Sequence, residues 1–274
     1  MIKDLLIVID NSRKADNFLR EALIFAERYD AFTEVLMLSP GPIAAADFAP
    51  LGALFVPDEV LRQEEAERLD VVRRALADAL CPVEVHGLRD DIAWLAHDFR
   101  REHPVVDLIL MGTEESWEIP WLRRRALETS LLATGTPLLI MPSQRPVERF
   151  RRAVLGWKPS REANRAVHDL VALADPGATI EIAMVGCAEG EAAEPHVAHV
   201  QRHLERHGFK VTLHLCPPGE WSGSAEVLEH LVRIHGADLL AVGGYAHSRV
   251  REIMFGGVTR ELVAHARVPV LLSH

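Results

Sequence analysis

Cysteine is scarce in this sequence, and the few cysteines that occur are scattered. Cys81, Cys187 and Cys216 make an odd number, and none of them stands in CxxC spacing. A disulfide framework or a cysteine zinc site needs several paired or closely spaced cysteines, so the sequence argues against both. We therefore expect the protein in a reducing compartment, the cytoplasm.

The sequence also has no excess of basic residues and no long hydrophobic run. Its 274 residues include 30 Lys and Arg against 40 Asp and Glu, a formal net charge of -10. Nucleic acids and anionic membranes attract basic surfaces, so we expect neither as a partner. The first apolar run is too short for a signal peptide, and no run approaches the ~20 residues of a membrane span.

Motifs of common catalytic sites are missing as well. The sequence contains no Walker A lysine loop, no GxGxxG, no GxSxG and no HExxH. Neither a general base nor a catalytic metal ligand can be identified from residue spacing. We therefore expect no enzyme, or at most very slow hydrolysis of a bound nucleotide.

Short apolar runs alternate with amphipathic helical patterns along the chain, and the same order occurs twice. Residues 5–9 and 105–111 are expected strands of the first half, and residues 153–157 and 238–242 are their counterparts. Such alternation predicts parallel sheets with right-handed crossovers. The landmarks that support a duplication are Ser12 with Ser160, Asp107 with Asp238, Gly112 with Gly243, and Pro137 with Pro269.

This repeat predicts two α/β domains, residues 1–145 and 150–274. The polar stretch 142–149 contains two prolines and is the expected linker. Helices are expected at 58–80, 91–101 and 126–133 in the first domain. The proline- and glycine-rich stretch 40–57 carries several apolar residues, so we expect it to pack on something.

A glycine-rich stretch near the C-terminus has geometry suited to an anion. The strand at 238–242 stops at Gly243 and Gly244, a basic loop follows, and Gly256 and Gly257 open a helical pattern that runs to His265. Glycine lets backbone N–H groups approach an anion closely, and a helix N-terminus favours negative charge. The alternative is that paired glycines only punctuate a loop.

This stretch resembles the C-terminal signature of the universal stress protein family, Gly-x2-Gly-x9-Gly-Ser/Thr. Gly243 stands at the first glycine and Gly256 at the third, whereas Ala246 replaces the second and Gly257 replaces the Ser/Thr. In nucleotide-binding members this loop holds the phosphates and ribose of ATP, so the resemblance implies the same role here.

The resemblance covers nearly the whole chain, as a tandem member. It implies two doubly wound open parallel five-stranded sheets of the adenine nucleotide alpha hydrolase type. By analogy with dimers of single-domain members, the terminal strands 137–141 and 269–272 would pair, making an intramolecular pseudo-dimer about a pseudo-two-fold axis. A homodimer of the whole chain is left open.

The candidate site of the second half lies at the carboxyl ends of its strands, where open α/β sheets bind ligands. Its residues are Lys158, Ser160, Val185, Val242, Gly243, Ala246, His247, Gly256, Gly257, Val258 and Thr259. Lys158 replaces an acidic residue of the family, and with His247 it contributes to a cationic mouth in an acidic protein. We expect weak binding of ATP, another adenine nucleotide or a smaller anion, and no metal.

The corresponding loop of the first half is not suited to a nucleotide. Asp10 retains the family's acidic residue, but the loop 112–118 carries three glutamates, and Arg124 and Arg125 stand where the second half has two glycines. Carboxylates repel a triphosphate, and side chains fill the place where bare backbone is needed. We expect a structural partner without ATP, its charges neutralising one another.

Four histidines lie on the expected helix 194–207, three of them four residues apart: His196, His199, His203 and His207. Such spacing can bind zinc or nickel, but no carboxylate or cysteine completes a set of ligands, and a solvated flank is favoured. A rival to nucleotide binding is a scaffold that acts through residues 40–57 or through the two loops.

Overall fold

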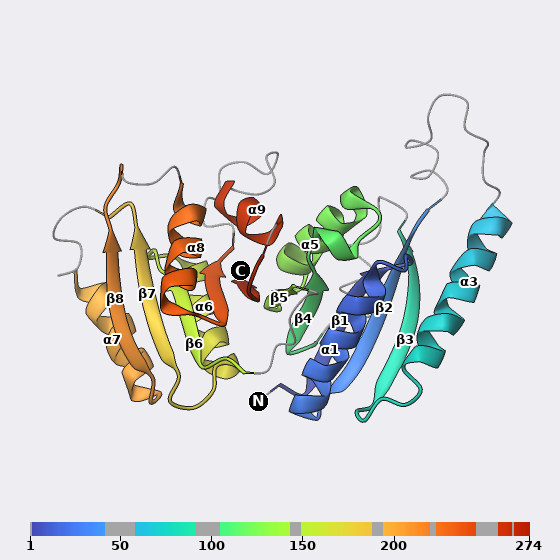
Figure 1. Cartoon of the computed structure of the whole chain (residues 1–274), viewed down its shortest axis with the longest axis horizontal. Helices are drawn as coiled ribbons and strands as arrows, with labels where there is room; N and C mark the ends of the chain where they lie inside the picture. The colour runs from blue at the N-terminus through green and yellow to red at the C-terminus, as the bar shows by residue number, and fades with distance from the viewer. Residues whose placement is uncertain are drawn as a thin grey trace. The chain divides into compact units, whose positions relative to one another are not determined.

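The computed structural model describes residues 2–41, 58–90, 105–142, 149–187, 194–219, 223–244, 257–264 and 266–274 (Figure 1). The chain divides into two compact units, Ile2–Thr136 and Pro137–His274. The predicted helix at 91–101, most of the 40–57 stretch and most of the predicted linker lie outside the described residues.

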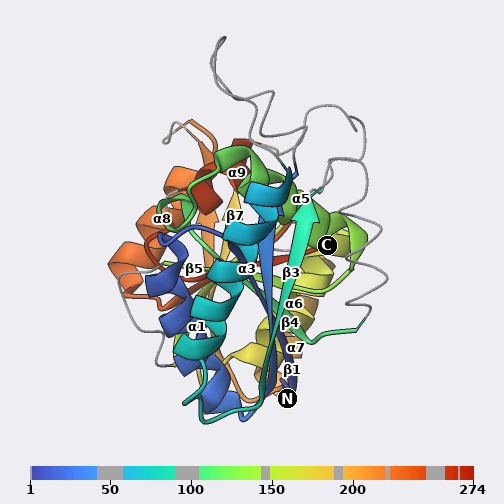
Figure 2. The same ribbon diagram turned by 90° about the vertical axis from the view of Figure 1, so that its right-hand side faces the viewer.

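The first unit has a parallel sheet in the order β3-β2-β1-β4. Its elements are β1 (Asp4–Asp10), α1 (Ala15–Tyr29), β2 (Phe32–Pro40), α3 (Asp58–Ala75), β3 (Val83–Asp90), β4 (Leu108–Gly112), the 3-10 helix η1 (Glu114–Ser116) and α5 (Pro120–Ala133). Figure 2 shows α1 and α3 on the same side of this sheet, with α3 running along β3. Arg68 of α3 donates a hydrogen bond to the Ser12 carbonyl and pairs with Asp16 of α1.

The second unit has a sheet in the order β5-β10-β9-β6-β7-β8, parallel except for β5. Its elements are β5 (Leu138–Met141), β6 (Arg152–Gly156), α6 (Arg161–Leu173), β7 (Thr179–Val185), α7 (Pro195–Arg206), β8 (Lys210–Cys216), α8 (Ser224–His235), β9 (Leu239–Gly243), α9 (Gly257–Ala264) and β10 (Val270–Ser273). Helix α6 packs against α7, and α8 packs against α9. The order β8-β7-β6-β9 repeats β3-β2-β1-β4 of the first unit, which confirms the predicted doubly wound α/β architecture.

The two fifth strands, β5 and β10, pair with each other in antiparallel register. Leu271 lies opposite Leu139, and Val270 and Leu272 lie opposite Ile140 and Leu138. Pro137 and Pro269 are equivalent in the repeat, so Leu139 is equivalent to Leu271. The pairing places these two equivalent residues opposite each other, as a local two-fold axis between the two strands requires. Strand β5 therefore groups with the second unit, and the compact units divide between residues 136 and 137.

Two predicted helices have different bounds in the structure. Helix α5 begins at Pro120 instead of 126, because proline suits the first turn of a helix, where its missing N–H is not needed. Helix α3 ends at Ala75 instead of 80, although its expected start at Asp58 is found. The early start of α5 matters for function, since it places Arg123 inside the helix.

An aspartate that directly precedes the fourth strand clamps the start of the first strand in each unit. Asp238 accepts hydrogen bonds from the backbone N–H groups of Arg151 (2.9 Å) and Arg152 (3.2 Å). Asp107 does the same for Lys3 (2.6 Å) and Asp4 (3.1 Å). Burial raises the pKa of Asp238, against the lowering effect of these N–H donors. The repeated clamp explains why the two aspartates are equivalent landmarks.

Replacing Asp238 with alanine leaves two N–H donors without their carboxylate. We expect Asp238→Ala to lower the free energy of unfolding by about 1–3 kcal/mol, and Asp238→Asn by less, because the amide oxygen still accepts one bond. The control is Asp70→Ala, which removes an exposed carboxylate paired with Arg73 and should change the value by less than about 0.5 kcal/mol. Urea unfolding measures both, and equal midpoints would contradict the role of Asp238.

Candidate functional site

Each unit has one place where the strand order reverses. Strand β1 lies between β2 and β4, and β6 lies between β7 and β9. At such a switch point the flanking connections leave in opposite directions, and ligands of open α/β sheets bind there, beyond the carboxyl ends of the strands. The two units can therefore be compared at the ends of β1 and β4 and at the ends of β6 and β9.

In the first unit, Asp10 at the end of β1 is fully buried and occupied by its own chain. Its Oδ1 accepts hydrogen bonds from the Ser12 N–H (3.1 Å) and hydroxyl (2.7 Å). Its Oδ2 accepts a bond from the backbone N–H of Glu118 at 2.7 Å. This last bond ties the end of β1 to the loop that follows β4. The carboxylate that stands at the family's acidic position therefore holds these two segments together.

The end of β4 is also filled by protein. The η1 turn folds back over Gly112, and a Cβ added to this glycine would lie 2.0 Å from Ser116 Oγ. Ser116 donates a hydrogen bond to the Thr113 carbonyl, and Trp117 beside it is 3% exposed. Gly112 is thus a glycine because the Ser116 side chain packs against it.

Arg123 completes this closed end of the first sheet. It is 3% exposed, and its Nε donates to the Gly112 carbonyl at 3.2 Å. Burial lowers the pKa of its guanidinium to about 10, although Glu114, 3.7 Å away, acts in the opposite direction. The sequence analysis did not assign this role to Arg123. The signal was helical spacing, since Arg123 stands four residues before the buried Leu127.

The other charges of this loop have local partners. Glu118 pairs with Lys14 at 2.7 Å, and Arg124 pairs with Glu128 at 2.9 Å along α5. The mutual neutralisation expected from the sequence is therefore present, with different partners for some of the residues. Arg124 and Arg125 lie within α5 and not in a phosphate loop.

In the second unit, the end of β9 meets the first turn of α6. Ser160 is the N-cap of α6, and its Oγ accepts a hydrogen bond from the Ala163 N–H at 3.0 Å. A Cβ added to Gly243 would lie 2.6 Å from the same Ala163 nitrogen. The bare backbone of Gly243 therefore allows β9 to end directly against a helix N-terminus, where a dipole favours negative charge.

The remaining predicted residues fall into two groups. Lys158 is exposed just after the end of β6. Val185 is the last residue of β7 and Val242 is the last but one of β9, so these three residues lie at neighbouring strand ends. Gly257, Val258 and Thr259 form the first turn of α9, where Thr259 is buried and Val258 is partly exposed. Ala246, His247 and Gly256 lie outside the described residues.

Two of the four predicted histidines, His203 and His207, make ring contacts near the end of α7. His203 lies edge-on to His168 (ring centroids 5.4 Å apart) and to His207 (4.7 Å). Burial lowers the pKa of His203, and the neighbouring His207, His168 and Arg206 lower it further. These rings therefore favour neutral imidazole at His203. His203 and His207 lie on one flank of the helix, as their four-residue spacing predicts.

No protein-family model matches the sequence, and no curated protein matches it. Solved structures do match. A universal stress protein from Archaeoglobus fulgidus DSM 4304 is similar at 14% identity with a TM-score of 0.67, covering 98% of this chain and 95% of that one. A Pseudomonas aeruginosa UCBPP-PA14 protein assigned as a universal stress protein is similar at 14% identity and a TM-score of 0.60, covering 99% and 93%.

The fold is therefore that of universal stress proteins in the tandem form, because one chain aligns with nearly the whole length of both structures. The resemblance drawn from the glycine signature is confirmed at the level of the fold. The cytoplasmic domain of a prokaryotic cation chloride cotransporter has a similar fold, at 11% identity and a TM-score of 0.51 over 100% of this chain and 95% of that one. Proteins of different function share this fold, so function must be argued from the site.

Removing the buried guanidinium should open the end of the first sheet. We expect Arg123→Ala to lower the free energy of unfolding by about 3 kcal/mol, since it leaves a cavity and frees the Gly112 carbonyl. The control is Arg124→Ala, whose side chain is 56% exposed and pairs along the helix, with an expected change of less than about 1 kcal/mol. Chemical denaturation of the full chain checks both, and a larger loss from Arg124→Ala would refute the assignment.

The two adjacent glycines after β9 should respond differently to a methyl group. Gly243→Ala forces the Cβ against the backbone of α6 and should lower the free energy of unfolding by about 1–3 kcal/mol. Gly244→Ala places its Cβ 3.6 Å from the Ser273 carbonyl oxygen, an ordinary contact, and should be nearly neutral. Thermal unfolding compares the two variants. The close approach of β9 to α6 is refuted if both are equally stable.

Proposed function

We propose that this protein is a cytoplasmic universal stress protein of the tandem type. Its second half binds an adenine nucleotide such as ATP, or a smaller anion, weakly at the carboxyl ends of β6 and β9. Its first half acts as a structural partner without nucleotide. Turnover is not part of the proposal, because no general base has been identified for it.

The observation that carries this proposal is the contrast between the two switch points. In the first unit, the Asp10–Glu118 hydrogen bond joins the end of β1 to the loop after β4, and Arg123 fills the space behind it. In the second unit, the equivalent strand ends carry an exposed Lys158, and Gly243 lies directly against the N-terminal turn of α6. The first arrangement favours a structural role for the first unit, and the second favours binding of an anion by the second unit.

Two features of the second unit support a weak interaction over a tight one. The Ser160 hydroxyl already accepts the N-cap hydrogen bond of α6, so it is committed to the helix. Gly257 stands where the family has a hydroxyl that can bind phosphate, a loss of roughly 1 kcal/mol for a neutral hydrogen bond. Lys158 offsets part of this loss through its charge, which makes the binding sensitive to salt.

The cytoplasmic assignment rests on the cysteines. All three are free thiols, two of them buried, as expected in a reducing compartment. No helix in the described part of the chain is long and apolar enough to cross a bilayer.

A second candidate function is a scaffold that binds no nucleotide. The similarity to a cotransporter's cytoplasmic domain favours it, because that protein uses the same fold in another setting. In this role the chain would act through residues 40–57 or through the loops after β4 and β9. The two candidates differ in one measurable property, which is whether the full chain binds a nucleotide at all.

The test is titration calorimetry of ATP into the full-length protein at low salt. Wild type should bind with a dissociation constant that weakens as salt is added. Lys158→Gln should weaken it several-fold, and Gly256→Val should abolish it, because the backbone can no longer approach the ligand. The control is Lys14→Gln, which removes an exposed lysine near the end of the first sheet and should leave the affinity unchanged.

Two results would move the assignment to the scaffold. One is the absence of ATP binding by wild type at low salt. The other is an affinity that is unchanged in Gly256→Val. A loss of binding in Lys14→Gln but not in Lys158→Gln would place the site in the first half and contradict the proposed division of roles.

A further inference from the structure

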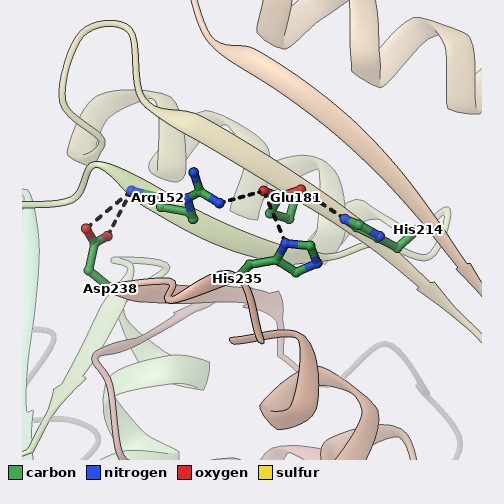
Figure 3. A network of polar contacts seen from close by, with 5 residues as sticks. All are labelled: Arg152, Glu181, His214, His235 and Asp238. Carbon is green, nitrogen blue, oxygen red and sulfur yellow. Dashed lines mark hydrogen bonds and ion pairs between the residues drawn. The ribbon is translucent and has the colours of Figure 1, made fainter. Parts of the chain in front are cut away.

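A buried carboxylate lies under α8 in the second unit, far from the strand ends described above. Glu181 is the third residue of β7 and is only 3% exposed. Its neighbours come from three other elements, as Figure 3 shows: Arg152 begins β6, His214 lies on β8, and His235 ends α8. A carboxylate buried to this degree requires partners for its charge.

Two imidazoles face this carboxylate from different sides. His214 Nε2 lies 2.9 Å from Glu181 Oε2, and His235 Nδ1 lies 3.7 Å from Oε1. The two rings are 4.6 Å apart at their centroids and tilted by 46°. Among the described residues, these three form the one set whose possible ligand atoms all lie within 4.8 Å of one another.

His235 has a further property that a hydrogen-bonded core histidine would lack. Its Nε2 is buried, and within the described part of the chain it has no hydrogen-bond partner. Buried polar atoms normally have a partner, so an imidazole with only the long Nδ1 contact to Glu181 is unusual. The nitrogen of this ring that faces Glu181 is Nδ1, and the nitrogen without a partner is Nε2.

We propose that Glu181, His214 and His235 bind a zinc ion or a similar divalent cation. Ligands at the ~2.0–2.2 Å distances that zinc prefers lie roughly 3.4 Å apart around a tetrahedral ion. The separations of 2.9 Å to Oε2 and 3.7 Å to Oε1 lie on either side of that value, and all possible ligand atoms of the set lie within 4.8 Å of one another. Two imidazoles and one carboxylate suit zinc, and three protein ligands leave a fourth position for water.

The first unit shows what distinguishes this set. Glu34 on β2 and His86 on β3 repeat the Glu181–His214 pair. In both units the histidine pairs with the residue that follows the glutamate by two positions on the neighbouring strand. There the second neighbour of the imidazole is another carboxylate, Glu84, at 3.4 Å, and the His86 side chain is 48% exposed. Only in the second unit do the described residues add a second imidazole and bury the carboxylate.

Arg152 is the one neighbour that opposes a cation. Its Nη1 lies 3.5 Å from Glu181 Oε1, but its side chain is 42% exposed and can turn toward solvent. Its backbone N–H is held by Asp238 whichever way the side chain points (Figure 3). A metal at Glu181 would displace this guanidinium, so removing its charge should favour the metal. A purely structural ion pair between Arg152 and Glu181 predicts no such gain.

The cation site is independent of the proposed nucleotide site. Glu181, His235 and Arg152 lie toward the amino ends of the parallel strands, whereas Lys158 and Val185 lie at the carboxyl ends. The sequence analysis searched for metal ligands along α7 and missed this set. Its members come from two strands and a helix end, 33 and 21 residues apart in the chain, and no local spacing joins them.

The test is calorimetric titration of ZnCl2 into chelator-treated full-length protein, without nucleotide. Wild type should bind one equivalent through this set. His214→Ala and His235→Ala should each weaken that binding by at least about 100-fold. Glu181→Gln should also weaken it strongly while keeping a hydrogen bond to His214, so it serves where an alanine variant does not fold. Arg152→Gln should bind zinc several-fold more tightly, because it removes a nearby positive charge.

Two histidine variants are the matched controls. His86→Ala removes the equivalent imidazole of the first unit, and His207→Ala removes an exposed member of the α7 ring contacts. Both should leave the zinc affinity unchanged. Cobalt(II) on wild type gives a readout that needs no variant: the expected spectrum is that of a four-coordinate ion without a thiolate charge-transfer band.

The proposal is overturned if wild type binds no zinc, or if cobalt shows cysteine ligation. It is equally overturned if His86→Ala or His207→Ala removes the binding that His214→Ala retains. An Arg152→Gln variant that binds zinc no more tightly would show that Glu181 does not ligate the ion.

Discussion

Burial of the central strands on both faces is the constraint on which the rest of this structure depends. Leu5, Leu6, Ile7, Val8 and Ile9 of β1 are all at most 1% exposed, because helices cover both faces of a parallel sheet. Such strands have no room for polar chemistry along their length. Polar groups therefore gather where the strands end or where an edge strand admits water. The switch points lie at strand ends, and the Glu181 set lies beside the edge strand β8.

The two units show how one scaffold supports different strand ends. Both keep the aspartate clamp, Asp107 or Asp238, which secures the start of the first strand through backbone N–H groups. At the opposite end they differ completely. Asp10 ties two segments of the first unit together, while the second unit presents Lys158 beside a capped helix N-terminus. Clamping supports the fold in both units, whereas the carboxyl ends are free to diverge.

The Glu181 set illustrates the same freedom at the other end of the sheet. A glutamate and a histidine on neighbouring strands recur in both units with the same register. Their surroundings decide what the pair does. Beside Glu84 the His86 imidazole has two carboxylates as neighbours and faces water, whereas His235 supplies a second imidazole next to a buried carboxylate. The residues supplied by neighbouring elements thus distinguish this polar pair from the proposed set of metal ligands.

Much of the fold followed from the sequence, because strand burial and helix amphipathicity are local patterns. The alternation of elements, the duplication, and the landmarks Asp107, Asp238 and Gly243 were all predictable in this way. The glycine signature also predicts a site at the ends of β6 and β9, which stays a prediction. Helix bounds were less predictable, since Pro120 can open a helix that the apolar spacing places later.

Only the tertiary structure decided which side chains meet. Arg123 contacts the Gly112 carbonyl only because α5 begins at Pro120, and Asp10 accepts the Glu118 N–H only because the loop after β4 returns to the end of β1. Glu181, His214 and His235 become neighbours only through strand register and the end of α8. The physical reason is that periodicity fixes which face a residue occupies, whereas contacts between distant segments depend on how those faces pack.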